Sequence, residues 1–368
     1  MRTRILKLIN KEFKLWFRAA PPGMIVLVVV IVIRMFGGMQ SMEWFFLDTM
    51  LRLRPEEPLD ERVVIVGIDI EDIRLSKQYP IPDRKIAELL TKLQSYKPRA
   101  IGLDLFKDVP VKPGSDELAR ILRENTNIIG IEKILPPGEI PPHKSLLSEQ
   151  VGFVDLRFDV DSKFRRYFLH TSVNENPPEN KFSLALQLIT QYFYAEGIEL
   201  GAGIKDPNAL MIASKELPRI NNQNFGGYVN VKVDGLYTLI NFRNSKKPFR
   251  VVSMRDVINN NVNPKWFRNS IILIGNRNPS AGDIFYSSAV PTLKLTGQIY
   301  GIDYHAHAIS DILSYAIDGR PMLSSWGDIQ EYIWIIIWGL VPIFLGRITQ
   351  SVWENLLSVG EAGVVLIG

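Results

Sequence analysis

Two aspartates stand at the ends of short apolar segments, in the sequences VGIDI and IGLDL. They are Asp69 and Asp104. If both segments are strands of one parallel sheet, their ends meet at the carboxyl edge, where open α/β folds bind ligands. Two neighbouring carboxylates there would ionise unevenly, and could act as acid and base or bind a cation or polar ligand. The interpretation that we favour is simpler: each caps a neighbouring helix or turn, as short acidic side chains commonly do.

Other polar residues offer weaker signals. Arg165 and Arg166 follow an expected turn, and strand alternation sends them to opposite faces, so only one reaches a shared cleft and the other is a solvated charge. His305 and His307 could bind a metal from a strand, but we expect a helix, on which positions i and i+2 point apart. We therefore expect no metal and no cofactor.

Several classes of chemistry lack their sequence signatures. The chain of 368 residues has no cysteine, which excludes disulfides and thiolate catalysis. It also lacks the glycine-rich nucleotide loops, the esterase elbow G-x-S-x-G and the zinc-protease motif H-E-x-x-H. The net charge of +4 comes from six basic residues in the first eighteen, so we expect no nucleic-acid surface.

Strands and helices alternate in the central part of the chain. Short runs rich in Val and Ile predict strands that are covered on both faces. A helix follows the first of them, with Asp83 as its expected N-cap and Ile86, Leu89, Leu90 and Leu93 on its buried face. Residues 152–173 predict an antiparallel hairpin with a turn at Asp161 and Ser162. The fold class is therefore α/β, with a mixed, largely parallel sheet flanked by helices. The predicted strands are residues 63–70, 99–106, 127–134, 236–243 and 270–278, and the predicted helices are 115–124, 183–197 and 301–315.

Apolar segments near both ends predict transmembrane helices. Residues 1–18 form a basic tail that should remain in the cytoplasm, and residues 19–40 are long enough to span a bilayer. In that span Arg34 should snorkel to the outer headgroups, and Trp44, Phe45 and Phe46 should form an interfacial belt. Residues 41–328 then lie outside the cytoplasm as one soluble block. Residues 329–346 return as a second span, residues 347–355 form a short cytoplasmic loop, and residues 356–368 begin a third span that is cut off. The expected location is the inner membrane, in a multi-pass arrangement.

An ordered series of segments resembles a known family. The segments are MEWFFLDTMLRLRPEEPLDERVVIVGIDIEDI, YPIPDRKIAELLTKLQSYKPRAIGLDLFKDVPV, VGFVDLRFDVDSKFRRYFL, SIILIGNRNPSAGDIFYSS and GIDYHAHAISDILSYAIDGRPML. Together they are similar to the second type of the CHASE extracellular sensory domains of bacterial cyclases and histidine kinases, with a flavour similar to cyanobacterial members. The resemblance covers residues 42–323, and it implies an N-terminal span, the sensory domain, further spans and a cytoplasmic output module.

The resemblance also implies which residues matter. The chain departs from the family pattern where Ser162 replaces a turn glycine and where no Thr-Pro follows Asp283. The residues that match the family's motifs are Asp48 and Arg52 after the span, Asp69 and Asp104 at strand ends, Asp161 and Arg165 at the turn, Gly275 and Asp283 in a late strand and loop, and His305 in a late helix.

These observations predict a membrane receptor of a signal-transduction or two-component system, and not an enzyme in its own right. Its candidate ligand-binding residues are Asp69, Asp104, Arg165 and Asp283. The expected partners are the membrane, an unknown ligand, a second copy of the chain, and an output domain that is a histidine kinase, nucleotide cyclase or Ser/Thr kinase. The alternatives are an anchored extracytoplasmic hydrolase that uses Asp69 and Asp104, and a scaffold for envelope proteins.

Overall fold

The computed structural model describes residues 20–174, 177–220, 224–231, 233–279, 282–287, 289–290 and 297–348. This chain divides into two compact units, which are described separately. The larger unit comprises residues 46–221 and 232–324, and the smaller unit comprises the residues up to 45, residues 222–231, and the residues from 325 onward. The expected cytoplasmic tail, the loop at 349–355 and the third span lie outside the described residues.

A six-stranded sheet forms the centre of the larger unit, and every neighbouring pair in it is parallel. The predicted parallel sheet is therefore confirmed. Its strands, in spatial order, are β11 (Phe249–Ser253), β1 (Asp60–Ile68), β12 (Ile271–Asn276), β2 (Ala100–Asp104), β3 (Ile128–Glu132) and β4 (Val151–Phe153).

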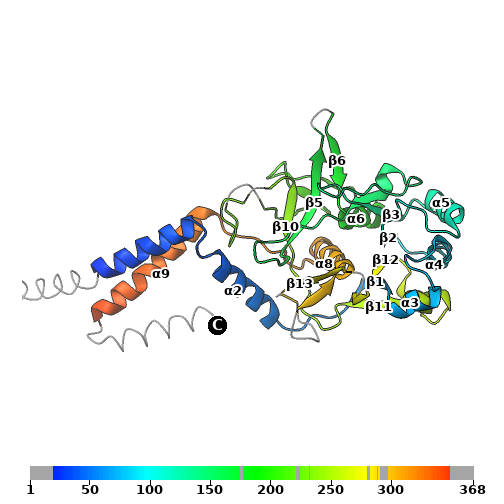
Figure 1. Ribbon diagram of the computed structural model, residues 1–368. Helices are drawn as coiled ribbons and strands as arrows, with labels where there is room; N and C mark the ends of the chain where they lie inside the picture. Colours follow the sequence, from blue (N-terminus) through cyan, green and yellow to red (C-terminus); the bar gives the residue numbers. More distant parts are fainter. Residues whose placement is uncertain are drawn as a thin grey trace, which may run out of the picture. The chain divides into compact units, whose positions relative to one another are not determined.

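Helices cover both faces of this sheet (Figure 1). Alternate residues of β1 enter two different cores: Val63 and Ile65 belong to one, and Val64 and Val66 to the other. Burial on both faces explains why these strands are continuous apolar runs. The first core is closed by α6 (Leu184–Tyr194) and α8 (Gly301–Leu313), which continues as a π-helical turn, Ser314–Asp318. The second core is closed by α3 (Ile70–Ser76), α4 (Asp83–Ser95), α5 (Ser115–Glu124) and α7 (Met254–Ile258).

Smaller antiparallel sheets complete the larger unit. The largest has the order β10 (Leu236–Leu239), β5 (Arg166–Val173) and β6 (Glu179–Phe182). A pair joins β13 (Ile284–Tyr286) to β14 (Gln298–Tyr300), and a third sheet contains β7 (Gly201–Ala202), β8 (Leu210–Ile212) and β9 (Lys215–Glu216). Short 3₁₀ turns lie at Ser148–Gln150 and Pro264–Trp266.

The hairpin predicted for residues 152–173 is wrong. Its first half, β4, is buried and pairs with β3 at the edge of the parallel sheet, whereas its second half, β5, pairs with β10 and β6. The predicted turn itself is confirmed, because the Ser162 amide donates to the Asp159 carbonyl and Ser162 has φ of 60°. A serine therefore adopts the left-handed conformation that glycine adopts more easily.

The predicted N-cap of α4 is also wrong, by one residue. Pro82 occupies that position, and Asp83 is the first helical residue. The Asp83 carboxylate forms a buried ion pair with Lys107 at 3.0 Å and accepts hydrogen bonds from the Val111 amide and the Ser115 hydroxyl. It thereby fixes the loop between β2 and α5. The apolar face predicted for α4 is confirmed, since Ile86, Leu89, Leu90 and Leu93 are fully buried.

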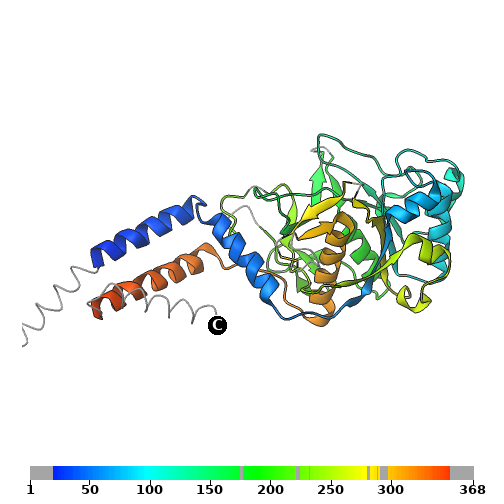
Figure 2. The ribbon, with the colours of Figure 1, turned by 60° about the horizontal axis from the view of Figure 1, so that its bottom comes forward.

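The smaller unit contains the helix Ala20–Met35, the start of α2 (Gln40–Leu53), and α9 (Asp328–Ile348). The helix Ala20–Met35 and α9 lie side by side in both views (Figures 1 and 2). A side chain at Gly23 would overlap Ile343, and one at Gly339 would overlap Leu27. The glycines thus permit the close approach that is typical of packed apolar helices.

Arg34 and Trp44 differ from their expected roles. The Arg34 side chain does not extend to headgroups: only 6% of the residue is exposed, and it pairs with Glu331 at 2.7 Å and with Glu43 at 3.1 Å. Trp44 is 2% exposed and packs on Tyr228, with ring centroids 5.1 Å apart. Both residues therefore hold the smaller unit together.

By length and composition, none of the described helices can cross a membrane by itself. The helix Ala20–Met35 and α2 satisfy the requirement only as a pair, and they meet at a bend of 82°.

Candidate functional site

A cavity of about 610 Å³ opens at the carboxyl edge of the parallel sheet. Strand ends form its floor: Ile68 ends β1, Asp104 ends β2 and Asn276 ends β12. The segment after β4 adds Val154 to the lining, and α8 adds His305. This is the edge at which open parallel sheets place their ligands.

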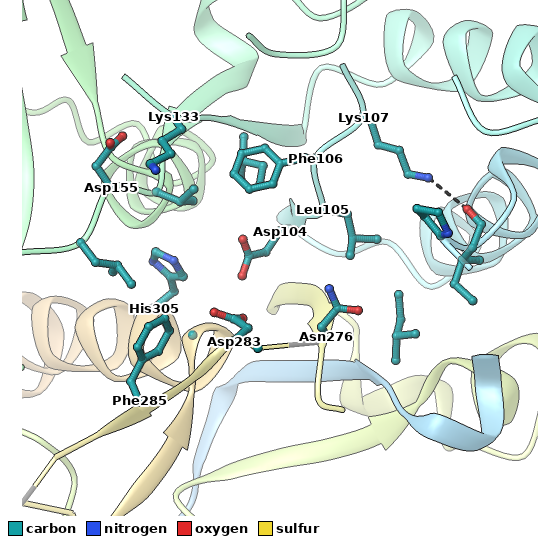
Figure 3. A pocket seen from close by; sticks show the side chains of 18 of the residues that line it. Asp104, Leu105, Phe106, Lys107, Lys133, Asp155, Asn276, Asp283, Phe285 and His305 are labelled. Carbon is teal, nitrogen blue, oxygen red and sulfur yellow. Dashed lines mark hydrogen bonds between the residues drawn. The ribbon is translucent and has the colours of Figure 1, made fainter. Parts of the chain in front are cut away.

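Asp104 lies at the centre of the cavity with its carboxylate turned into it (Figure 3). Neighbouring protein groups raise its pKa from 3.8 to about 8, mainly because burial disfavours the charged form, and the nearby Asp283 carboxylate adds to this effect. Within the described chain, Asp104 has no hydrogen bond or ion pair through its side chain. The Asp104 carboxylate is therefore not neutralised by a described protein group, and it can be neutralised by a proton from solvent or by a bound cation.

Asp283 precedes β13 and directs its carboxylate toward the same space as Asp104 (Figure 3). It lies against the first residue of α8: a methyl group at Gly301 would come 2.5 Å from Asp283 Oδ1, so a side chain there would displace the carboxylate. Burial raises the pKa of Asp283, a hydrogen bond from the Gly301 amide partly offsets this, and Asp303 raises it further. The two acids thus share one cavity, and the Asp283 carboxylate disfavours ionisation of Asp104.

His305 borders the acids and is only 3% exposed. Its Nδ1 lies 2.6 Å from the Tyr167 hydroxyl. Burial lowers the pKa of His305 to about 3, so the ring is neutral. In the part of the chain that the structure describes, Nε2 has no hydrogen-bond partner, so one polar ring atom at the cavity wall is left for a ligand.

Aromatic residues and two further charged groups complete the lining. Phe106, Phe158 and Phe285 supply apolar surface, and Phe106 and Phe158 are themselves about half exposed. Asp155 is already occupied, because it accepts the backbone amides of residues 134 and 135, each at 2.8 Å. Lys133 lies beside Asp155 in Figure 3, and not between the two acids at the centre.

Comparison with known families identifies the chain. A family profile described as CHASE2 domain matches residues 25–344. The chain belongs to this family of sensory domains. No curated protein and no solved structure matches it. The sensory domain resemblance drawn from the sequence is thereby confirmed, although nothing here bears on a cyanobacterial origin.

Asp69 does not line the cavity of this CHASE2 domain. Asp69 is the N-cap of α3: its Oδ1 accepts the amides of Glu71 and Asp72 in a reciprocal capping box, and both oxygens bind Arg255. The cap predicted for Asp69 is therefore confirmed. Asp104, by contrast, caps none of the described helices and faces the cavity.

Arg165 is also separate from the cavity lining. It forms buried ion pairs with Asp48 at 2.8 Å and Asp159 at 3.0 Å, and a further one with Asp161 at 2.7 Å. The neighbouring Arg166 is not the solvated charge that was predicted, because its side chain is 11% exposed and pairs with Asp159 at 2.9 Å.

We expected His305 and His307 to lie on a helix, which argued against a shared metal, and both do lie on α8 of the CHASE2 domain. Among the described residues, no group of three or more His, Asp or Glu side chains could hold a metal ion. Sequence reasoning missed Tyr167 and Asn276. A signal existed for Asn276, since IILIGN ends in a glycine followed by a polar residue at the edge where Asp104 ends β2.

Proposed function

We propose that this chain is the extracytoplasmic sensory part of a bacterial membrane receptor, and that the cavity around Asp104 binds its chemical cue. The observation that carries the proposal is the cavity itself: it lies at the ligand-binding edge of a parallel sheet and contains two acids and a buried histidine whose groups face it. Membership in a sensory family supports the same role.

A second cavity, of about 670 Å³, is the other candidate for the ligand site, and its charged residues differ from those around Asp104. Its lining includes Arg277 and Asp303, which form an ion pair with each other at 2.9 Å. Its two lysines, Lys246 and Lys247, are exposed side chains. The second cavity also has a buried histidine, His307, in its lining, but the Asp104 cavity is lined by two carboxylates, Asp104 and Asp283, that form no ion pair among the described residues.

Binding without turnover is the activity that we propose. The hydrolase alternative requires Asp69 and Asp104 to act on one substrate, but both Asp69 oxygens are bound by Arg255 and the α3 amides. An acid that caps a helix and neutralises an arginine has little capacity left for proton transfer.

The proposed route of the signal begins at α2. This helix is continuous from Gln40 to Leu53, and it carries the chain from the smaller unit into the larger one. Asp48 lies in the part of α2 that belongs to the larger unit, and it pairs there with Arg165 at 2.8 Å. A ligand that favours one arrangement of the sensory domain by about 1–3 kcal/mol would shift α2 and the apolar helices joined to it.

The remaining partners belong to the same proposal. The apolar helices would be embedded in the cell membrane, two copies of the chain would form a homodimer, and a C-terminal kinase or cyclase module would receive the signal. The close packing of the helix Ala20–Met35 against α9 supports a membrane location, because small residues permit such contacts between membrane helices.

Thermal unfolding in the presence of a small-molecule extract tests the cavity. The extract is prepared from the source organism and its medium, and the protein is the full chain in detergent. We expect the extract to raise the unfolding midpoint of the wild type and to leave that of Asn276→Phe, which fills the cavity, unchanged. Asn261→Phe makes the same change at an exposed position and should respond like the wild type. Equal shifts in all three proteins, or no shift in the wild type, would contradict the proposal.

Topology has its own test, which the absence of cysteine makes simple. Single cysteines at Asp116 and at Thr3 are treated in whole cells with a thiol reagent that cannot cross the inner membrane. Labelling only at position 116 is expected, and labelling at position 3 would contradict the proposed orientation.

A further inference from the structure

The two acids at the cavity floor have no positive partner. In the described residues, neither Asp104 nor Asp283 forms an ion pair. Two lysines line the same cavity: Lys107 pairs with Asp83, and Lys133 lies beside Asp155 and not between the two acids. A cation brought by the ligand would relieve this unfavourable arrangement.

The surroundings restrict the kind of cation. A metal ion is disfavoured, because no group of three or more metal-ligating side chains of these types is present among the described residues. Phe106, Phe158 and Phe285 line the same cavity, and aromatic faces attract organic cations while covering an apolar body. The cavity volume of about 610 Å³ suits a small organic molecule.

His305 supplies the second feature of the ligand. It is 3% exposed and lines the cavity, and its Nε2 has no hydrogen-bond partner among the described residues. A hydroxyl group can both donate and accept, so a ligand hydroxyl would satisfy this nitrogen.

We propose that the cavity recognises a small protonated amine that also carries a hydroxyl group, with its ammonium group between Asp104 and Asp283 and its hydroxyl at His305 Nε2. The apolar body of the ligand lies against Phe106, Phe158 and Phe285. This inference rests on the proposed function, since it names the class of cue that the cavity takes.

Protonation is coupled to this binding. The titratable groups that line the cavity with Asp104 are Asp283, His305, Asp155, Lys107, Lys133 and Tyr79, and Tyr167 lies behind His305. Because the pKa of Asp104 is about 8, its carboxyl group holds a proton at neutral pH and must release it to bind a cation. Affinity for a permanently charged ammonium should therefore rise as the pH rises through about 8.

Three probes of one shape test the proposal by calorimetric titration of the full chain. They are 2-amino-1-phenylethanol, the neutral 1-phenyl-1,2-ethanediol and the anion mandelate. We expect the amine to bind about tenfold to a hundredfold more tightly than the diol, and mandelate not to bind. Asp104→Asn and Asp283→Asn should each weaken amine binding by about tenfold or more, and should change diol binding much less because no ion pair is lost. Asp116→Asn removes an exposed carboxylate from α5 and is the control for net charge.

A fourth probe isolates the protein's own titration. The trimethylammonium derivative of the amine keeps its charge at every pH, so a rise in its affinity between pH 6 and about 9 reports the ionisation of Asp104. Asp104→Asn should remove most of that rise.

Equal affinities for amine and diol, or amine binding that Asp104→Asn leaves intact, would overturn the inference, as would a failure of the amine to bind. The proposed function is judged separately by the extract experiment with Asn276→Phe. If the extract stabilises the wild type but the amine and the diol bind equally well, the amine proposal is refuted and the proposed sensory cavity is still supported.

Discussion

The guanidinium of Arg165 holds both carboxylate oxygens of Asp48, with Nε 2.9 Å from Oδ1 and Nη2 2.8 Å from Oδ2. The two side chains are 4% and 3% exposed. Asp159 and Asp161 occupy the remaining face of the same guanidinium, and together these carboxylates raise the pKa of Arg165, against the effect of burial. A buried fork of this kind has a fixed geometry. The end of α2 is thereby fastened to the turn that precedes β5.

Removing one partner of this pair should destabilise the domain. Asp48→Ala leaves Arg165 buried without its bidentate partner, and we expect a loss of about 3–5 kcal/mol in the free energy of unfolding, measured by urea denaturation. Asp161→Ala removes a more exposed carboxylate from the same arginine and should cost much less. Similar losses in both variants would contradict the special contribution that we assign to the ion pair between Asp48 and Arg165.

Asp69 should matter for stability and not for ligand binding. Asp69→Ala removes the cap of α3 and the ion pair with Arg255, so we expect it to cost about 1–2 kcal/mol. Asp69→Asn keeps a capping oxygen and should recover most of the loss. Both variants should bind 2-amino-1-phenylethanol like the wild type in calorimetry, and weaker binding by either one would place Asp69 in the site.

The dependence of stability on pH reports the cavity acid. The folded chain raises the pKa of Asp104 from 3.8 to about 8, so it retains a proton that the unfolded chain has lost. Stability is therefore greatest below pH 3.8 for this group and falls as the pH rises toward about 8. His305 and His307, with pKa values lowered to about 3, act in the opposite direction, but only below pH 6.5.

Above pH 6.5 the two histidines no longer contribute, so the free energy of unfolding measured between pH 6.5 and 9 should decrease. Asp311, with a pKa of about 7, also contributes to this decrease. Asp104→Asn should flatten the decrease. A variant profile parallel to that of the wild type would mean that Asp104 ionises normally.

Gly301 is expected to be intolerant of any side chain. In Gly301→Ala the new methyl group would come within 2.5 Å of Asp283 Oδ1, which would displace the carboxylate from the start of α8. We expect weaker binding of the amine probe with little change in diol binding. Gly282→Ala provides a comparison, because that glycine is also near Asp283 but has open space around it, although its φ of 74° makes the substitution mildly strained. Unchanged amine affinity in Gly301→Ala would contradict the assigned position of Asp283.

The helices of the smaller unit can be tested by crosslinking in membranes. Gly339 faces Leu27, so a pair of cysteines at these positions should form a disulfide within one chain upon mild oxidation. Cysteines at Leu27 and Ile333 are the mismatched control, since Ile333 lies nearly two turns earlier on α9 and is half exposed. Equal crosslinking of both pairs would argue against the packing of the two helices.

Local patterns were sufficient to predict much of the fold. The apolar runs ending at Asp104 and Asn276, and the amphipathic pattern of α4 and α5, follow directly from burial on two faces or on one. Strand order was beyond this reasoning: β12, from late in the chain, inserts between β1 and β2, and nothing local specifies that neighbour.

The site was predictable only in part, for a related reason. Asp104 could be placed at the carboxyl edge of a strand, but its partner is Asp283, which lies 179 positions later and was singled out only by family resemblance. Asp69 has the same sequence context as Asp104, yet α3 begins directly after it and takes its oxygens as a cap. The start of that helix decides between a structural acid and a cavity acid.

The central claim, that the cavity receives the signal, is tested most directly by output measured in the native membrane. The wild type, Asn276→Phe and Asn261→Phe are each fused to a histidine-kinase reporter module, which stands in for the proposed output module, and the activity of that reporter is followed as the cue-containing extract is added. We predict that the wild type and Asn261→Phe respond alike, while Asn276→Phe is present at the same membrane level and does not respond. A full response from Asn276→Phe would contradict the account.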